Sequence, residues 1–173
     1  MNHKKRMIAG SILMSATLAF SLYGLGRTWA SSTTQPDPLY LEECGSCHLA
    51  YPAQLLPPAS WQKIMSQLDD HFGENAELEA ESRKAISEYL DSASQQKKGS
   101  YRKLFRNLGD KVPDRITKLP YFIHEHDEIP SRYIKANDKV ASLSQCNACH
   151  KRAQQGNFDE DDVYIPGFGR WDD

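Results

Sequence analysis

Two short motifs constrain this 173-residue chain more than any other feature of its sequence. Residues 44–48 read Cys-Gly-Ser-Cys-His, and residues 146–150 read Cys-Asn-Ala-Cys-His. Together the motifs use all four cysteines, and each places a histidine directly after its second cysteine. Thiols at positions i and i+3 and an imidazole at i+4 lie on one face of a helical turn. The pattern therefore predicts two separate sites, each built from two thiols and one imidazole.

Three ordinary uses of paired cysteines fit this pattern less well. Two structural disulfides are common in exported chains, but they leave His48 and His150 unexplained. The cysteine pairs of a zinc site usually lie about 12 to 20 residues apart, whereas Cys47 and Cys146 lie about a hundred apart. A thioredoxin-like redox pair would need a βαβ context, which this sequence does not show.

Covalent haem attachment, in contrast, requires this spacing as it stands. The two thiols add to the vinyl groups of the porphyrin, and the histidine reaches the iron. We therefore predict two covalently bound c-type haems. The predicted tethers are Cys44, Cys47, Cys146 and Cys149, and the predicted proximal iron ligands are His48 and His150.

The first thirty residues are typical of an export signal. A basic stretch at residues 3–6 precedes an uncharged apolar run at 7–26, and Thr28-Trp29-Ala30 offers a cleavage site. We predict cleavage after Ala30. The alternative is an uncleaved membrane anchor, which the glycines and serines of the run disfavour. Export predicts a periplasmic protein that contacts a membrane only if its leader is retained.

Loss of this leader would make the chain acidic. Residues 1–30 hold four basic side chains and no acidic one, so a balance of 21 bases to 23 acids becomes 17 to 23. A nucleic-acid-binding protein needs a basic face, and nucleic acid is therefore not an expected partner. The charge instead favours protein partners with a basic surface.

The rest of the chain predicts a mainly α, loop-rich fold in two halves. Apolar residues at helical spacing predict one helix from Pro58 to a stop at Gly73, and a second from a cap at Asn75 to Leu90. Prolines break the later residues into short pieces without a strand-like alternation. The predicted division is a signal peptide at 1–30, an N-terminal haem domain at 31–98 and a C-terminal haem domain at 99–173.

Each iron has a sixth position, for which few candidates remain after cleavage. Met65 lies beside Ile64 on an apolar helical stripe and is predicted to pack in the core. His71 lies near the same stripe. His124 and His126 are two residues apart and cannot share a helical face, so one is predicted to be a ligand and the other to be exposed.

The sequence separations favour a particular pairing. His71 follows His48 by 23 residues, and His126 precedes His150 by 24, so each half can close its own coordination with a loop of modest entropic cost. Two haems with two histidine ligands each would result. A crossed arrangement, in which His71 reaches the second haem, remains an alternative.

These residues give the chain a resemblance to the DHC family of dihaem cytochromes c. The stretches that carry the resemblance are residues 43–52, Leu56-Pro57 with Trp61, residues 68–75, Arg115-Ile116-Thr117 with Pro120, Glu125-His126-Asp127 and residues 156–160. The resemblance implies two covalent haems with bis-histidine coordination, in a class I cytochrome c-like N-terminal half and a less regular haem-binding C-terminal half. It also favours His126 over His124, because the family histidine directly follows the position of Glu125.

The resemblance further implies an electron-transfer protein. Family members exchange electrons with a small oxygen-binding monohaem cytochrome or a membrane b-type cytochrome, and similar redox partners are expected here. The alternative is a small haem enzyme of the peroxidase or nitrogen-oxide reductase type, with one open iron site. It is disfavoured because three spare histidines suffice for two sixth positions and no catalytic pocket motif is present.

Overall fold

The computed structural model describes residues 35–96 and 99–171. We call these ranges the first half and the second half, although both belong to one compact unit. The predicted export signal and its cleavage site lie outside the described residues. Within the described residues, no helix is both long enough and apolar enough to cross a bilayer.

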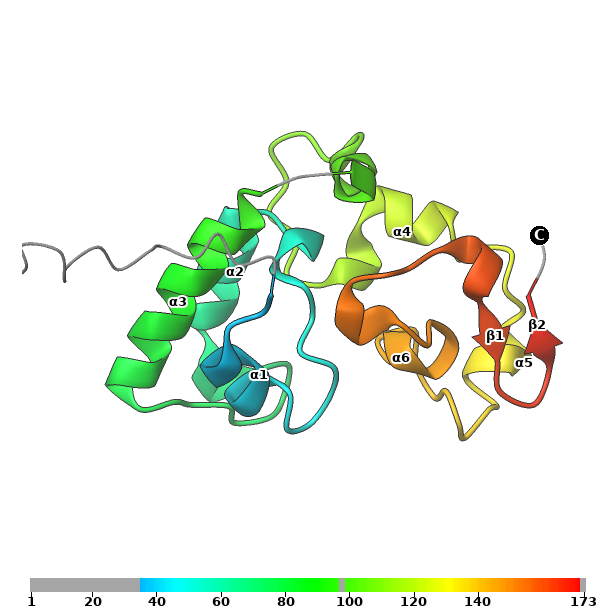
Figure 1. Cartoon of the computed structure of the whole chain (residues 1–173), viewed down its shortest axis with the longest axis horizontal. Helices are drawn as coiled ribbons and strands as arrows, with labels where there is room; N and C mark the ends of the chain where they lie inside the picture. Colours follow the sequence, from blue (N-terminus) through cyan, green and yellow to red (C-terminus); the bar gives the residue numbers. More distant parts are fainter. Residues whose placement is uncertain (1–34, 97–98, 172–173) are drawn as a thin grey trace, which may run out of the picture. The chain divides into compact units, whose positions relative to one another are not determined.

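The first half is built from three helices (Figure 1). They are α1 (Pro38–Cys44), α2 (Pro58–Met65) and α3 (Ala80–Ser94), with 3₁₀ turns η1 (Ala53–Leu55) and η2 (Leu68–Asp70). The Asp37 side chain caps α1 by accepting a hydrogen bond from the Tyr40 amide at 3.1 Å, and Pro38 occupies the first turn, where no amide hydrogen is needed. The two longer helices, α2 and α3, pack against each other.

The second half consists of short elements. They are η3 (Gly99–Phe105), η4 (Ile116–Lys118), α4 (Pro120–His124), α5 (Ser131–Ile134), α6 (Cys146–Cys149), η5 (Ala153–Gln155), η6 (Glu160–Asp162), β1 (Tyr164–Ile165) and β2 (Gly169–Arg170). The two strands form an antiparallel hairpin with Tyr164 opposite Arg170. The prediction of a mainly α, loop-rich fold is confirmed. Two details remain predictions: that the first half resembles a class I cytochrome c, and that the second half is a less regular haem-binding domain.

The first predicted helix begins at Pro58 as expected, but its predicted end and the predicted start of the second helix are wrong. The helix from Pro58 ends at Met65 rather than before Gly73, and Phe72 has a left-handed backbone (φ 61°) and an exposed ring. The second helix begins at Ala80, because the Asn75 side chain accepts a hydrogen bond from the Glu77 amide at 2.8 Å and forms a local turn. Local turn chemistry therefore overrides the apolar periodicity between the two helices.

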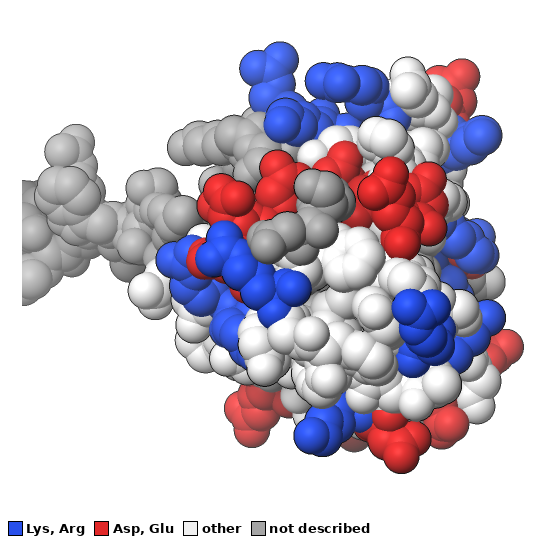
Figure 2. Space-filling model, turned by 90° about the vertical axis from the view of Figure 1, so that its right-hand side faces the viewer, with Lys and Arg blue, Asp and Glu red and all other residues white. Residues whose placement is uncertain are grey.

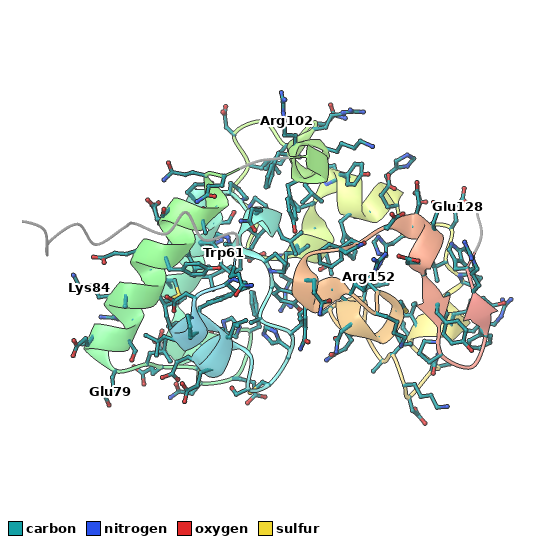
Figure 3. The ribbon with its side chains drawn as sticks, viewed as in Figure 1. Trp61, Glu79, Lys84, Arg102, Glu128 and Arg152 are labelled. Atoms are coloured by element: carbon teal, nitrogen blue, oxygen red, sulfur yellow. The ribbon has the colours of Figure 1, made fainter. Side chains whose placement is uncertain are left out.

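One hydrophobic cluster extends past the predicted domain boundary. It centres on first-half side chains such as Trp61, whose indole nitrogen donates to the Ala53 carbonyl at 2.7 Å (Figure 3). The same cluster contains Leu108, Ile116, Leu119 and Phe122 of the second half. Lys97 and Lys98, at the predicted boundary, lie outside the described residues. The division into two haem domains therefore stays a prediction.

Candidate metal centres

The first cysteine motif begins in the last residue of α1. The Gly45 amide donates to the Leu41 carbonyl at 3.1 Å, and a β-carbon at position 45 would collide with that same oxygen. A glycine between the cysteines therefore permits the close turn. Cys44 is partly buried and Cys47 is exposed, so this site opens to solvent at one thiol.

The second motif forms the one-turn helix α6. The His150 amide donates to the Cys146 carbonyl at 2.8 Å, and His150 then leaves the helix in an extended conformation that pairs with Val163. Both thiols of this motif are partly buried. The backbone of Val163, between η6 and β1, therefore positions His150.

All four cysteines lie in the described residues as free thiols, without disulfides. Burial raises the pKa of Cys44 and that of Cys146 to about 11. A thioredoxin-like redox cysteine needs a lowered pKa, since the thiolate is the reactive form. The environment of Cys44 and Cys146 therefore disfavours the redox-pair alternative.

The first pair of histidines faces each other across a gap. The ring centroids of His48 and His71 are 6.3 Å apart, with an angle of 17° between the ring planes. His71 follows η2, and its amide donates to the Glu74 carbonyl at 2.7 Å. Burial and the neighbouring His48 lower the pKa of His71. Its imidazole is therefore neutral at pH 7, as a metal ligand must be.

The second pair has the same separation but a different orientation. The ring centroids of His126 and His150 are 6.3 Å apart, and their planes are inclined by 62°. Burial, followed by the charge of His126, lowers the pKa of His150 to about 4, and burial also lowers the pKa of His126. Both imidazoles are therefore neutral at pH 7.

The equal separations fit one metal between each pair. An imidazole nitrogen binds a transition metal at about 2 Å, and the ring centroid lies roughly 1 Å behind that nitrogen. Two imidazoles on opposite sides of one metal therefore have centroids about 6 Å apart. Both pairs of histidines, at 6.3 Å, meet this requirement. The numbers of residues between the histidines do not by themselves require equal distances between the rings.

Backbone carbonyls orient one ring of each pair. The Nδ1 atom of His48 lies 2.7 Å from the Leu49 carbonyl oxygen, and Nδ1 of His126 lies 2.8 Å from that of Phe122. A hydrogen on Nδ1 that bonds to a carbonyl leaves Nε2 unprotonated and able to bind a metal. The Nδ1 atom of His150 is buried without a hydrogen-bond partner among the described residues.

A cavity of about 600 Å³ surrounds the second pair. Its walls include His126, His150, Cys146 and Cys149 together with apolar side chains such as Ile134, Val140, Phe158 and Ile165. Two thiols and two imidazoles in a large, mostly apolar cavity match the needs of a haem, which is planar, apolar and attached at its edge. The residues present therefore fit this cofactor.

The remaining candidates lie elsewhere. His124 is the last residue of α4 and is exposed, whereas His126, two residues later, is half-buried against His150. Met65 is buried in the hydrophobic cluster, 7% exposed. The structure thus brings together the four predicted residues of the second site around one cavity and the two predicted histidines of the first site. It leaves His124 and Met65 outside both groups.

Sequence reasoning missed the aromatic neighbours of the histidines. Phe122 stacks on His126, with ring centroids 3.9 Å apart and an angle of 10° between the planes. Tyr51 stacks on His48 at 4.8 Å. The spacing of four residues between Phe122 and His126 is the usual spacing of neighbours on a helix and could have revealed that contact. No comparable sequence signal marks the hydrogen bond that the Tyr51 hydroxyl donates to the Ser144 carbonyl in the second half.

Comparison with known proteins indicates the same cofactor. The family model of dihaem cytochrome c matches residues 40–158. The X-ray structure of a dihaem cytochrome c from Shewanella baltica is 46% identical, with a TM-score of 0.66, over 78% of this chain and 97% of that one. A dihaem cytochrome c from Rhodobacter sphaeroides is 42% identical, with a TM-score of 0.63, over 70% and 96%. A comparison with curated proteins gave no match.

Proposed function

Because the chain belongs to the dihaem cytochrome c family, we propose that it is a periplasmic carrier that passes single electrons from a membrane donor to a soluble acceptor. Two covalently bound haems and electron transfer are properties of this family. The periplasmic location, the membrane donor and the soluble acceptor go beyond these family properties and are what we propose. The predicted leader supports the location, and the acidic chain supports partners with a basic surface.

The observation that carries the proposal is the pair of facing imidazoles at each site. We assign His48 and His71 to the first iron and His126 and His150 to the second, with the cysteines of each motif as tethers. When bound, haem supplies a one-electron couple between ferrous and ferric iron. If these four imidazoles bound the two irons, no position would be left for a substrate, and the protein would act as an electron carrier.

The protein's own residues would keep each site rigid during electron transfer. Leu49 and Phe122 fix the His48 and His126 rings through their carbonyls, and the Phe122 ring also stacks on His126. Ligands that keep their orientation in both oxidation states lower the reorganisation that accompanies each electron. Histidine in place of methionine as sixth ligand also keeps the reduction potential below that of His/Met cytochromes.

Carbon monoxide distinguishes this function from the enzyme alternative. We expect the reduced native protein to bind no carbon monoxide at pH 7, because an imidazole occupies each sixth position. The absorption spectrum of the reduced protein before and after addition of the gas provides the measurement. Rapid, stoichiometric binding at either haem would instead support a peroxidase or reductase with an open iron.

Charge is distributed unevenly along the chain. Residues 35–91 hold eleven acidic and three basic side chains, whereas residues 92–173 hold twelve acidic and fourteen basic ones. Figure 2, which shows a face formed by the second half, has acidic and basic side chains next to each other. A basic partner is therefore attracted mainly to the first half, near α1, where Glu42 and Glu43 are exposed beside Cys44.

Electron exchange with a basic soluble cytochrome should therefore slow as salt is added, because ions screen the attraction. Stopped-flow oxidation of the reduced protein at increasing ionic strength measures this effect. Neutralising the pair Glu42→Gln and Glu43→Gln should lower the rate at low salt, and the matched pair Asp110→Asn and Asp138→Asn in the second half should not. Equal losses from both pairs would count against docking at the first half.

A further inference from the structure

Tyr51 links the two metal centres. Its ring stacks on the imidazole of His48, with centroids 4.8 Å apart and an angle of 24° between the planes. Its hydroxyl group donates a hydrogen bond of 2.7 Å to the Ser144 carbonyl oxygen, across 93 residues of sequence. Its own carbonyl oxygen accepts a hydrogen bond of 2.5 Å from the Tyr40 hydroxyl. Tyr51 is thus held at three points, of which two belong to the first half and one to the second.

The Ser144 carbonyl connects this contact to the second centre. Ser144 lies two residues before Cys146, and the Cys146 thiol is directed to the same carbonyl oxygen at 3.8 Å. One backbone oxygen therefore lies between the Tyr51 hydroxyl and a sulfur that tethers the second haem. The Tyr51 hydroxyl is the donor in this contact, and the carbonyl oxygen can only accept.

We propose that Tyr51 is a positioning residue for electron exchange between the two haems. The inference rests on the proposed function, in which His48 binds the first iron and Cys146 tethers the second haem. Exchange between the two bound haems would move one electron and would transfer no proton or group. Tyr51 holds the two centres at a fixed separation while this happens.

The two parts of the side chain have different tasks. The hydroxyl holds the segment Ser144–Cys146 against the first centre, because it forms a direct hydrogen bond between these regions that a phenylalanine could not make. The ring restrains the orientation of His48 from one side, while the Leu49 carbonyl restrains Nδ1. The rate of electron exchange should therefore depend on the Tyr51 hydroxyl. The reduction potential of the first haem should depend on the Tyr51 ring.

Substitutions at Tyr51 separate these two tasks in the holoprotein. Tyr51→Phe keeps the ring and should slow electron exchange roughly 10-fold, because small displacements of reacting groups have large effects on rate. The potential of the first haem should stay unchanged in this variant, and Tyr51→Leu should shift it. Exchange spectroscopy of haem methyl resonances in the half-reduced protein measures the rate, and potentiometry measures the potentials.

Tyr89→Phe is the matched control. Tyr89 is also half-buried, packs against Tyr40 with ring centroids 5.2 Å apart, and interacts with the Asp37 backbone in the first half alone. The variant Tyr89→Phe should leave the rate of electron exchange unaltered. An unaltered rate in Tyr51→Phe would overturn the proposal, and so would failure of that variant alone to hold both haems, since the hydrogen bond would then be structural only. Absence of exchange in the unchanged protein would also overturn the proposal, whereas binding of carbon monoxide by the unchanged reduced protein would refute the proposed function itself.

Discussion

Replacing His71 by alanine is expected to open the first haem and replacing His126 the second, with each opened iron turning high-spin and binding carbon monoxide when reduced. The reason is that each imidazole faces a motif histidine at 6.3 Å, whereas His124 is exposed and Met65 is buried in the hydrophobic cluster. The effect is all-or-none at one site, because a ligand is removed rather than weakened. Absorption and resonance Raman spectra report the spin state of each haem.

His124→Ala is the control for these variants. His124 is exposed at the end of α4, so its loss should leave both haems low-spin. The separate potentials of the haems identify which site has opened and so test the crossed alternative, in which His71 serves the second iron. Opening by His124→Ala without opening by His126→Ala would refute the ligand assignment.

Preventing attachment of the second haem should unfold much of the second half. The cavity around His126 and His150 measures about 600 Å³. At about 24 cal/mol for each Å³ of empty volume, such a void would cost at most about 14 kcal/mol if it stayed dry, and collapse and entry of water reduce this cost. The total stability of a domain is about 5–15 kcal/mol, so the second half would lose most of its stability.

The double variant Cys146→Ser and Cys149→Ser tests this expectation, and Cys44→Ser with Cys47→Ser is its matched control. The control variant removes the first tethers but leaves the hydrophobic cluster around Leu56, Trp61 and Leu90 intact. Limited proteolysis and circular dichroism should therefore show loss of residues 120–171 in the first case only. Equal resistance of the two variants would show that the second half does not depend on its cofactor.

Much of the site could be predicted from the sequence, because the spacing of the cysteines and histidine in each motif already determines which cofactor the motif can bind. Two thiols and an imidazole at fixed separations leave little freedom, and the short separations from His48 and His150 identify His71 and His126 as distal candidates. Periodicity alone could not choose between His124 and His126. The choice followed from the position of Glu125 in the family pattern, and the burial of His126 against His150 supports it.

Two other features could not be predicted, one because local turns replace a helix and the other because it depends on a contact that is distant in sequence. The apolar stripe predicted a helix to Gly73, but the chain leaves α2 at Met65 and places His71 in a turn that presents its ring to His48. A helix extended to this point would have fixed the ring on the face of α2 instead. The contact from Tyr51 to Ser144 bridges the two halves and has no local signature.

Paramagnetic resonance of the oxidised protein tests the bis-histidine assignment, on which the proposed function depends, most directly. We predict two low-spin ferric signals. The near-infrared bands of both haems should have the position that is typical of bis-histidine coordination. The ring planes of His48 and His71 are nearly parallel at 17°, whereas those of His126 and His150 are inclined by 62°, so the first signal should be ordinary rhombic and the second strongly anisotropic. A high-spin signal in the native protein, or the near-infrared band of methionine ligation, would contradict the assignment.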